Sequence, residues 1–146
     1  MTEEFIQVLR AWNGDDEYAE RTPPFGYLLT LDLYGCKETY LCDLGRAYAF
    51  LETLVCNLGV NKQAPPSVFL SPPEYTDKVG ITGFVPLIES GIQIHTLQPR
   101  RYVSIVIFCC RKINEKTVKA IAQTFFEPHG IETKQIECGR KYYWVD

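Results

Sequence analysis

The sequence predicts an α+β fold, a two-layer α/β sandwich in which two helices cover one face of a mostly antiparallel sheet. Several segments are rich in β-branched and aromatic residues, which favour strands. Two other segments carry apolar residues at helical spacing. The order along the chain is strand, helix, three or four strands, helix, strand, and this order suits such a sandwich.

Residues 1–25 are predicted to form a loosely attached N-terminal arm, because they are polar and end in the proline-containing "RTPPFG". A partner subunit is expected to order this arm. Residues 26–146 then form a single domain. Its first strand lies in "GYLLTLDLYGC", residues 26–36, where Leu31 and Leu33 alternate with Asp32, and it ends near Gly35.

Two segments are predicted to be helical. The first spans residues 41–58 and stops at Gly59, and its apolar residues recur at steps of three and four: Leu44, Tyr48, Leu51, Val55 and Leu58. The second spans residues 114–126 behind an Asn114 cap and before "EPHG", and its apolar face consists of Val118, Ile121, Ala122 and Phe125.

The other apolar segments are predicted strands. They are "SVFL" at 67–70, "ITGFVPLI" at 81–88, "GIQIHT" at 91–96 and "YVSIVIFCC" at 102–110. The last is the most β-branched and should be central. Pro86 indicates an edge or a bulge, because proline cannot donate to a ladder. "IETKQIEC" and "KYYWV" are expected to finish the chain as strands or an extended tail.

Composition narrows the class of function. The 146 residues are 46% hydrophobic and 23% charged, which is ordinary for a globular domain with one core. The net charge of -3 and the scattered basic residues argue against nucleic-acid binding. No run is long enough to span a membrane and the acidic N-terminus does not resemble a signal peptide, so we expect a cytoplasmic protein without membrane association.

The six cysteines are expected to be free thiols, because a chain of this size needs no disulfides and carries no secretory signal. No C-x-x-C pair occurs, and only His95 and His129 could join the cysteines. The spacing therefore does not predict a metal site.

"ESG", at Glu89–Gly91, separates two of the predicted strands. Its residue types alone predict a hairpin turn. However, Ser90 follows a glutamate, His95 lies five residues on within "IHT", and Cys110 lies fifteen residues beyond the histidine. With Pro99, "FCC" at 108–110 and "GITGFV" at 80–85, this pattern resembles the prokaryotic S-adenosylmethionine decarboxylase family over roughly residues 26–126.

The resemblance implies a pyruvoyl-dependent enzyme that cuts its own chain between Glu89 and Ser90. An N-to-O acyl shift and a β-elimination would convert Ser90 into a pyruvoyl group, an electron sink for decarboxylation of a small amine. With S-adenosylmethionine as substrate, the product is the aminopropyl donor for spermidine. The family also implies a homodimer.

The resemblance also suggests roles for individual residues. Thr82, which stands where relatives usually have serine, is the candidate donor for the oxyanion of the acyl shift. His95 is the candidate base for the α-proton of Ser90, and Cys110 is the acid that reprotonates the product. Cys109, on the opposite face of the same strand, is expected in the core. The candidate substrate contacts are Asp32, Phe69 and Leu97.

Three departures from the family pattern keep alternatives open. Gly91 stands where histidine usually follows the cleavage serine, and Leu97 stands where an aromatic residue is common. Arg100 and Arg101 follow Pro99 in place of an acidic residue, and two cations would repel a sulfonium. The candidates for the missing ring are Phe69, Tyr75 and Phe84. The alternatives are a pyruvoyl-dependent decarboxylase of arginine or ornithine, and a regulatory homologue that is never processed.

Overall fold

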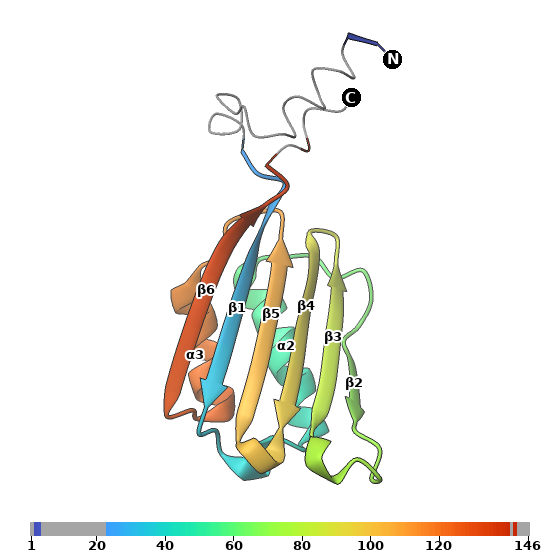
Figure 1. Cartoon of the computed structure of the whole chain (residues 1–146), viewed down its shortest axis with the longest axis vertical. Helices are drawn as coiled ribbons and strands as arrows, with labels where there is room; N and C mark the ends of the chain where they lie inside the picture. The colour runs from blue at the N-terminus through green and yellow to red at the C-terminus, as the bar shows by residue number, and fades with distance from the viewer. Residues whose placement is uncertain (1, 4–22, 141, 143–146) are drawn as a thin grey trace.

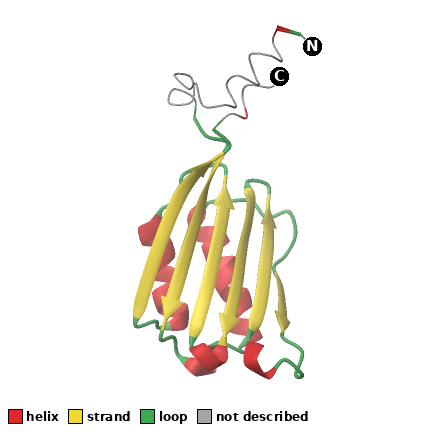
Figure 2. Cartoon of the chain, viewed as in Figure 1, coloured by secondary structure: helices red, strands yellow, loops and turns green. Residues whose placement is uncertain are grey.

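The computed structural model describes residues 2–3, 23–140 and 142 (Figure 1). Most of the predicted arm, residues 1–25, and most of "KYYWV" lie outside the described residues. The described chain forms a six-stranded antiparallel sheet with two helices on one face, which confirms the predicted α+β sandwich (Figures 1 and 2).

The sheet has the strand order β2-β3-β4-β5-β1-β6. Its strands are β1 (Gly26–Tyr34), β2 (Ser67–Leu70), β3 (Ile81–Leu87), β4 (Ser90–Leu97), β5 (Tyr102–Cys109) and β6 (Gly130–Cys138). As predicted, β5 is central, because it pairs with β4 on one side and with β1 on the other. Short 3-10 helices at Glu38–Tyr40, Thr76–Lys78 and Gln98–Arg100 occupy connections.

Helix α3 (Glu115–Phe126) begins after its predicted cap and α2 (Leu44–Leu58) ends before the predicted Gly59, but α2 begins three residues later than predicted, at Leu44 instead of residue 41, because Asp43 caps it. Helix α2 ends at Gly59, whose φ of 64° is the left-handed conformation that glycine favours. Helix α3 is capped by Asn114, whose side chain accepts a hydrogen bond from the Thr117 amide. The buried face of α2 differs from the prediction at Tyr48, which is 39% exposed.

The core lies between the helices and the face of the sheet that they cover. Strand residues on this face, such as Leu31, Ile94 and Ile105, are fully buried. On the helices, Phe50 packs against Phe126 with ring centroids 4.9 Å apart and against Phe125 at 5.6 Å. The two helices are therefore joined through aromatic contacts above the sheet.

The other face of the sheet carries no helix in the described chain, and we call it the open face (Figure 2). Because side chains alternate along a strand, the residues between the buried ones project from this face. Several are large and apolar: Phe69 is 64% exposed, Ile136 is 54% exposed and Phe84 is 46% exposed. Such a surface on a small domain indicates an interaction site.

Pro86 occupies a local edge, as predicted. Strand β2 pairs with β3 only from Ile81 to Phe84, so Pro86 lies beyond the end of β2. Beyond β2, the segment after α2 pairs with β3 instead: the Gln63 amide donates to the Pro86 carbonyl and Lys62 forms a bridge with Leu87. The chain before β2 thus reaches the β3–β4 turn.

All six cysteines are unpaired, as expected. Within the described part of the chain, no helix has the length and hydropathy of a membrane span.

Replacing Phe50 with alanine should test the aromatic junction between the helices. We expect Phe50→Ala to lower the free energy of unfolding by about 3–5 kcal/mol, because it leaves a cavity between two other rings. Tyr48→Ala, on the exposed side of the same helix, should change it by about 0.5 kcal/mol or less. Urea unfolding followed by circular dichroism measures both, and equal losses would contradict the assignment.

Candidate functional site

The "ESG" segment runs from a tight hairpin turn into β4, and its Ser90 has an unusual backbone conformation. Leu87 pairs with Ser90, and Ile88 and Glu89 form the turn between them. Ser90 has a φ of 143°, the only non-glycine φ above 100° among the described residues. The residue types therefore predicted the correct connection but placed the turn too late, since Ser90 and Gly91 already belong to β4.

Ser90 is strained, because side chains clash with the backbone at such a φ and proteins almost always use glycine there. The glycine in this sequence stands one position later. A Cβ atom at Gly91 would lie 3.0 Å from a ring carbon of Phe84, so the ring occupies the space that a larger residue would need. The ring of Phe84 therefore packs directly over Gly91.

The Glu89–Ser90 peptide bond lies beside the end of β5. The backbone amide of Cys110 donates a hydrogen bond to the carbonyl oxygen of Glu89 at 3.1 Å. An oxyanion formed by attack on that carbonyl would develop on this oxygen, so the Cys110 amide is a preorganised donor for it. The side chain of Cys110 is exposed, whereas Cys109 is buried as predicted, and burial raises the pKa of its thiol.

The carboxylate of Glu89 is also held. Asn61 donates to it twice, from its backbone amide at 3.0 Å and from its side chain at 2.7 Å. These bonds lower the pKa of Glu89 below its ordinary value. A lowered pKa means that the interaction is intact above the ordinary titration range of glutamate and is lost as the pH falls through the folded-state pKa.

Thr82 and His95 form a second group. They are cross-strand partners on β3 and β4, and the Thr82 Oγ1 and His95 Nδ1 atoms lie 3.0 Å apart. Both side chains project from the open face. The hydroxyl predicted as an oxyanion donor and the imidazole predicted as a base thus contact one another.

The structure does not bring this pair to Ser90 within one chain. His95 follows Ser90 by five residues on the same strand, so they are separated by about 16 Å at the usual rise per residue. Proximity in sequence therefore does not make His95 a neighbour of its own Ser90.

Candidate residues on other strands share the row of His95. The register of the sheet aligns Phe69, Thr82, His95, Ser104 and Asp32 across five strands. Asp32 accepts a hydrogen bond from the Tyr102 hydroxyl. Burial, followed by this hydrogen bond, raises the pKa of Tyr102. One polar row thus crosses the middle of the open face.

Two hollows lie on the open face, one at each group. Thr82 and His95 border a hollow of about 330 Å³, whose other walls include Phe69, Tyr75 and Lys78. Ser90 borders another of about 350 Å³ together with Phe84 and Phe108. Apolar walls with a few polar groups are typical of small-molecule sites.

Leu97 and the arginine pair lie at the end of β4 and beyond. Leu97 is half-buried and pairs with Tyr102. Arg100 is exposed at the end of a 3-10 helix. Arg101 donates from Nε to the carbonyl of Cys36 at 2.8 Å, so its guanidinium has a structural partner away from the hollows.

Two other residues contribute in ways that sequence reasoning missed. Thr96 is fully buried, and its hydroxyl donates to the Leu41 carbonyl at 2.6 Å and accepts from the Ile81 amide at 2.8 Å. The threonine of "IHT" is thus structural. Asn61 was also missed, because its contact with Glu89 joins residues 28 positions apart and no local pattern indicates it.

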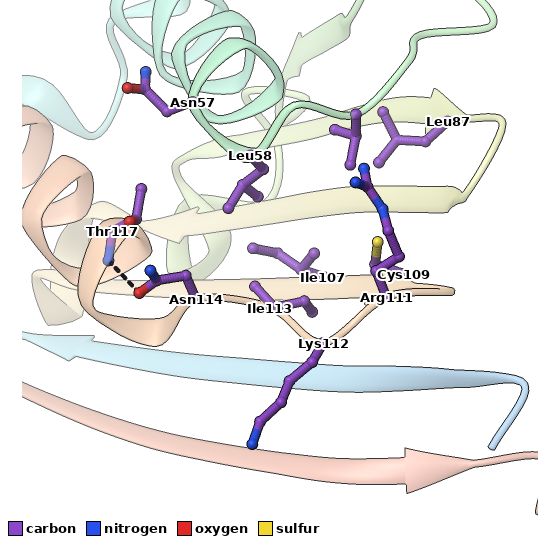
Figure 3. Close-up of a pocket in the computed structure, with 11 residues that line it drawn as sticks. Asn57, Leu58, Leu87, Ile107, Cys109, Arg111, Lys112, Ile113, Asn114 and Thr117 are labelled. Carbon is purple, nitrogen blue, oxygen red and sulfur yellow. Dashed lines mark hydrogen bonds between the residues drawn. The ribbon is translucent and has the colours of Figure 1, made fainter. Parts of the chain in front are cut away.

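A cavity of about 210 Å³ lies on the helix side of the sheet, between α2, α3 and the end of β5 (Figure 3). Figure 3 shows Leu58, Ile107 and Ile113 around it, with Lys112 directed away from its centre. Arg111 donates to the Gly59 carbonyl at 2.9 Å. The cavity contains no predicted site residue, and its only thiol belongs to the buried Cys109, so we do not assign the chemistry to it.

Comparisons with known proteins agree with the resemblance. The family model described as S-adenosylmethionine decarboxylase matches residues 27–139. Among solved structures, the adenosylmethionine decarboxylase of Aquifex aeolicus VF5 superimposes with a TM-score of 0.65 and 21% identity, over 80% of this chain and 92% of that chain. This likeness shows the fold. No curated protein matches the sequence significantly.

Alkylation of thiols should separate the two adjacent cysteines. In a Ser90→Ala chain at pH 8, we expect iodoacetamide to modify the exposed Cys110 and Cys56 within minutes. Cys36 and Cys109 should react only on unfolding, because both are buried and burial raises the pKa of Cys36 to about 11. Peptide mass mapping measures this order, and equal rates at Cys109 and Cys110 would refute the placement.

Proposed function

Because the chain belongs to the S-adenosylmethionine decarboxylase family, a family of carboxy-lyases, we propose that it cleaves itself between Glu89 and Ser90 and then decarboxylates S-adenosylmethionine. The product would be the aminopropyl donor for spermidine synthesis. The observation that carries this proposal is the strained Ser90, with φ 143°, directly after a carbonyl that already accepts a hydrogen bond from Cys110.

The cleavage uses atoms of the chain and one water. Ser90 Oγ adds to the carbonyl carbon of Glu89, the peptide C–N bond breaks, and an ester forms. Removal of the Ser90 α-proton expels the Glu89 carboxylate and leaves dehydroalanine at position 90. Water then replaces its nitrogen, which departs as ammonia, and a pyruvoyl group remains. The acyl shift relieves the strain at Ser90, because it removes the constrained peptide bond.

The Cys110 amide supports both steps from one position. It stabilises the oxyanion while Ser90 attacks, and it then stabilises the carboxylate that leaves. A serine hydroxyl is a weak nucleophile at neutral pH, so strain and this donor are the local assistance that the chain itself provides. The residues at the turn therefore fit formation of a pyruvoyl group.

The base must come from elsewhere, because His95 of the same chain is about 16 Å away along the strand. We propose a homodimer in which two open faces meet about a twofold axis. A twofold axis that sets the Thr82–His95 pair of one copy over Ser90 of the other also makes the reverse contact, since such interfaces are self-complementary. The exposed rings of Phe69 and Phe84 give this face its apolar character.

The substrate would lie between the two copies. The hollow beside His95 has Phe69 and Tyr75 in its wall, and these rings supply an aromatic surface for adenine in place of the one missing at Leu97. Aromatic faces also attract cations such as the sulfonium. Arg101 is engaged by the Cys36 carbonyl, so its charge does not argue for another substrate.

The reaction itself needs an electron sink and a proton. When formed, the pyruvoyl group supplies the electron sink for loss of carbon dioxide. Cys110 is our candidate acid for returning a proton to the product, because its exposed thiol follows the strand end beside the turn. Six unpaired thiols suit a reducing compartment, and we propose the cytoplasm.

The mass of the purified protein under denaturing conditions tests self-cleavage. We expect two fragments, one ending at Glu89 and one beginning with a pyruvoyl group at position 90. Ser90→Ala should remain a single chain of 16.8 kDa, because it lacks the nucleophile. A wild-type chain that stays intact for days would refute the proposal and favour a regulatory homologue.

Release of carbon dioxide from carboxyl-labelled substrates tests the substrate. We expect turnover of S-adenosylmethionine and a loss of at least a hundredfold for arginine and ornithine, which lack an adenine for Phe69 and Tyr75. Phe69→Ala should raise KM about fivefold, since one stacking contact is worth on the order of 1 kcal/mol. Faster turnover of arginine or ornithine would favour the alternative decarboxylase.

A further inference from the structure

The segment that follows α2 is fastened to the turn that we propose to be cut. Helix α2 ends at Gly59, and Asn61 then lies against residues 88 and 89. The Asn61 carbonyl accepts from the Ile88 amide at 2.9 Å. The Asn61 amide and side chain donate to the Glu89 carboxylate at 3.0 and 2.7 Å. One residue thus makes three hydrogen bonds to the two residues before Ser90.

These contacts explain how the strain at Ser90 persists. A two-residue hairpin loop ordinarily places its positive φ within the loop, where glycine or asparagine stands. Here the loop residues are Ile88 and Glu89, neither of which has a positive φ, and the positive φ falls on Ser90. A strained conformation survives only where its surroundings fix it, and an unrestrained turn would relax.

The turn is fixed on both sides. Asn61 holds its outer side through Ile88 and Glu89, and the Cys110 amide holds the Glu89 carbonyl from the side of β5. Farther from the turn, the Lys62–Leu87 bridge continues the contact of the same segment with β3. The carbonyl group of Glu89 is therefore held from both sides, and the unfavourable backbone conformation falls on Ser90.

We propose that Asn61 is a positioning residue for self-cleavage, which holds the Glu89 side chain so that the carbonyl of Glu89 stays within reach of Ser90. This inference rests on the proposed function. It also gives the glutamate before the cut a physical role. A carboxylate accepts both Asn61 hydrogen bonds at once, and such charge-assisted bonds are stronger than neutral ones.

Rates of chain cleavage test the proposal. Protein from a short pulse of expression is purified at once, and the intact chain is followed by mass spectrometry over time. We expect Asn61→Ala to cleave about tenfold more slowly than the wild type. Asn57→Ala is the matched control, because Asn57 bonds to Thr53 within α2 and has no bond to the turn. It should cleave at the wild-type rate.

A polarity exchange separates positioning from a general loss of stability. Asn61→Asp sets two carboxylates against one another and should slow cleavage more than Asn61→Ala. Adding Glu89→Gln restores a donor–acceptor pair between the side chains. The double variant should therefore cleave at least fivefold faster than Asn61→Asp alone, a coupling that a merely structural role of Asn61 would not produce.

Failure of the role of Asn61 can be distinguished from failure of the proposed function. If the wild type cleaves and Asn61→Ala cleaves equally fast, the role of Asn61 is refuted and the proposed function stands. Slowing without rescue in the double variant also refutes it. A wild-type chain that never cleaves overturns the proposed function, and the role of Asn61 with it.

Discussion

Alternation of side chains in the antiparallel sheet, with helices on only one face, determines where every functional group of this protein lies. On each strand, every second side chain points toward the helices and forms the core with Phe50 and Phe126. The side chains between them project from the open face, where polar groups form one row with exposed rings around it. Because strands are rigid and extended, a residue five positions from the cut is remote from it. The sheet thus separates Ser90, the proposed nucleophile, from His95, the proposed base, within one chain.

Strain at one residue complements this separation. A serine with a φ of 143° is costly to fold, and proteins retain such residues mainly at functional sites. In this chain the unfavourable conformation of Ser90 is maintained because the Asn61 contacts and the Cys110 amide hold the turn in place. In our proposal the bond to be cut is prepared within one chain, and the base reaches it only from a second copy. Cleavage would then depend on assembly, and an isolated chain would remain intact.

Much of the fold could be predicted because its signals are local. Alternating leucines marked β1, the helix caps marked α2 and α3, and the β-branched run marked β5 as central. Tyr48 was wrongly assigned to the buried face of α2. Apolar residues lie on two neighbouring sides of this helix, and only its packing against the sheet shows which side is buried. The N-terminal arm lies outside the described residues and stays a prediction.

The candidate site was only partly predictable. Spacing identified Ser90, His95, Thr82 and Cys110, but it gave no indication that they form two groups, because that depends on sheet register. The Asn61 contact with Glu89 and the ring of Phe84 over Gly91 join residues that are distant or unremarkable in sequence. The structural partner of Arg101 likewise depends on tertiary contacts.

If the proposed site is shared between two copies, two chains that are each inactive should complement one another. Ser90→Ala and His95→Ala chains of different mass are produced together, and each is also produced alone. We expect that neither is processed alone, and that in the mixture the His95→Ala chain is cut, because it receives His95 from its partner. If the His95→Ala chain stays intact in the mixture, or is processed alone, the shared site is contradicted.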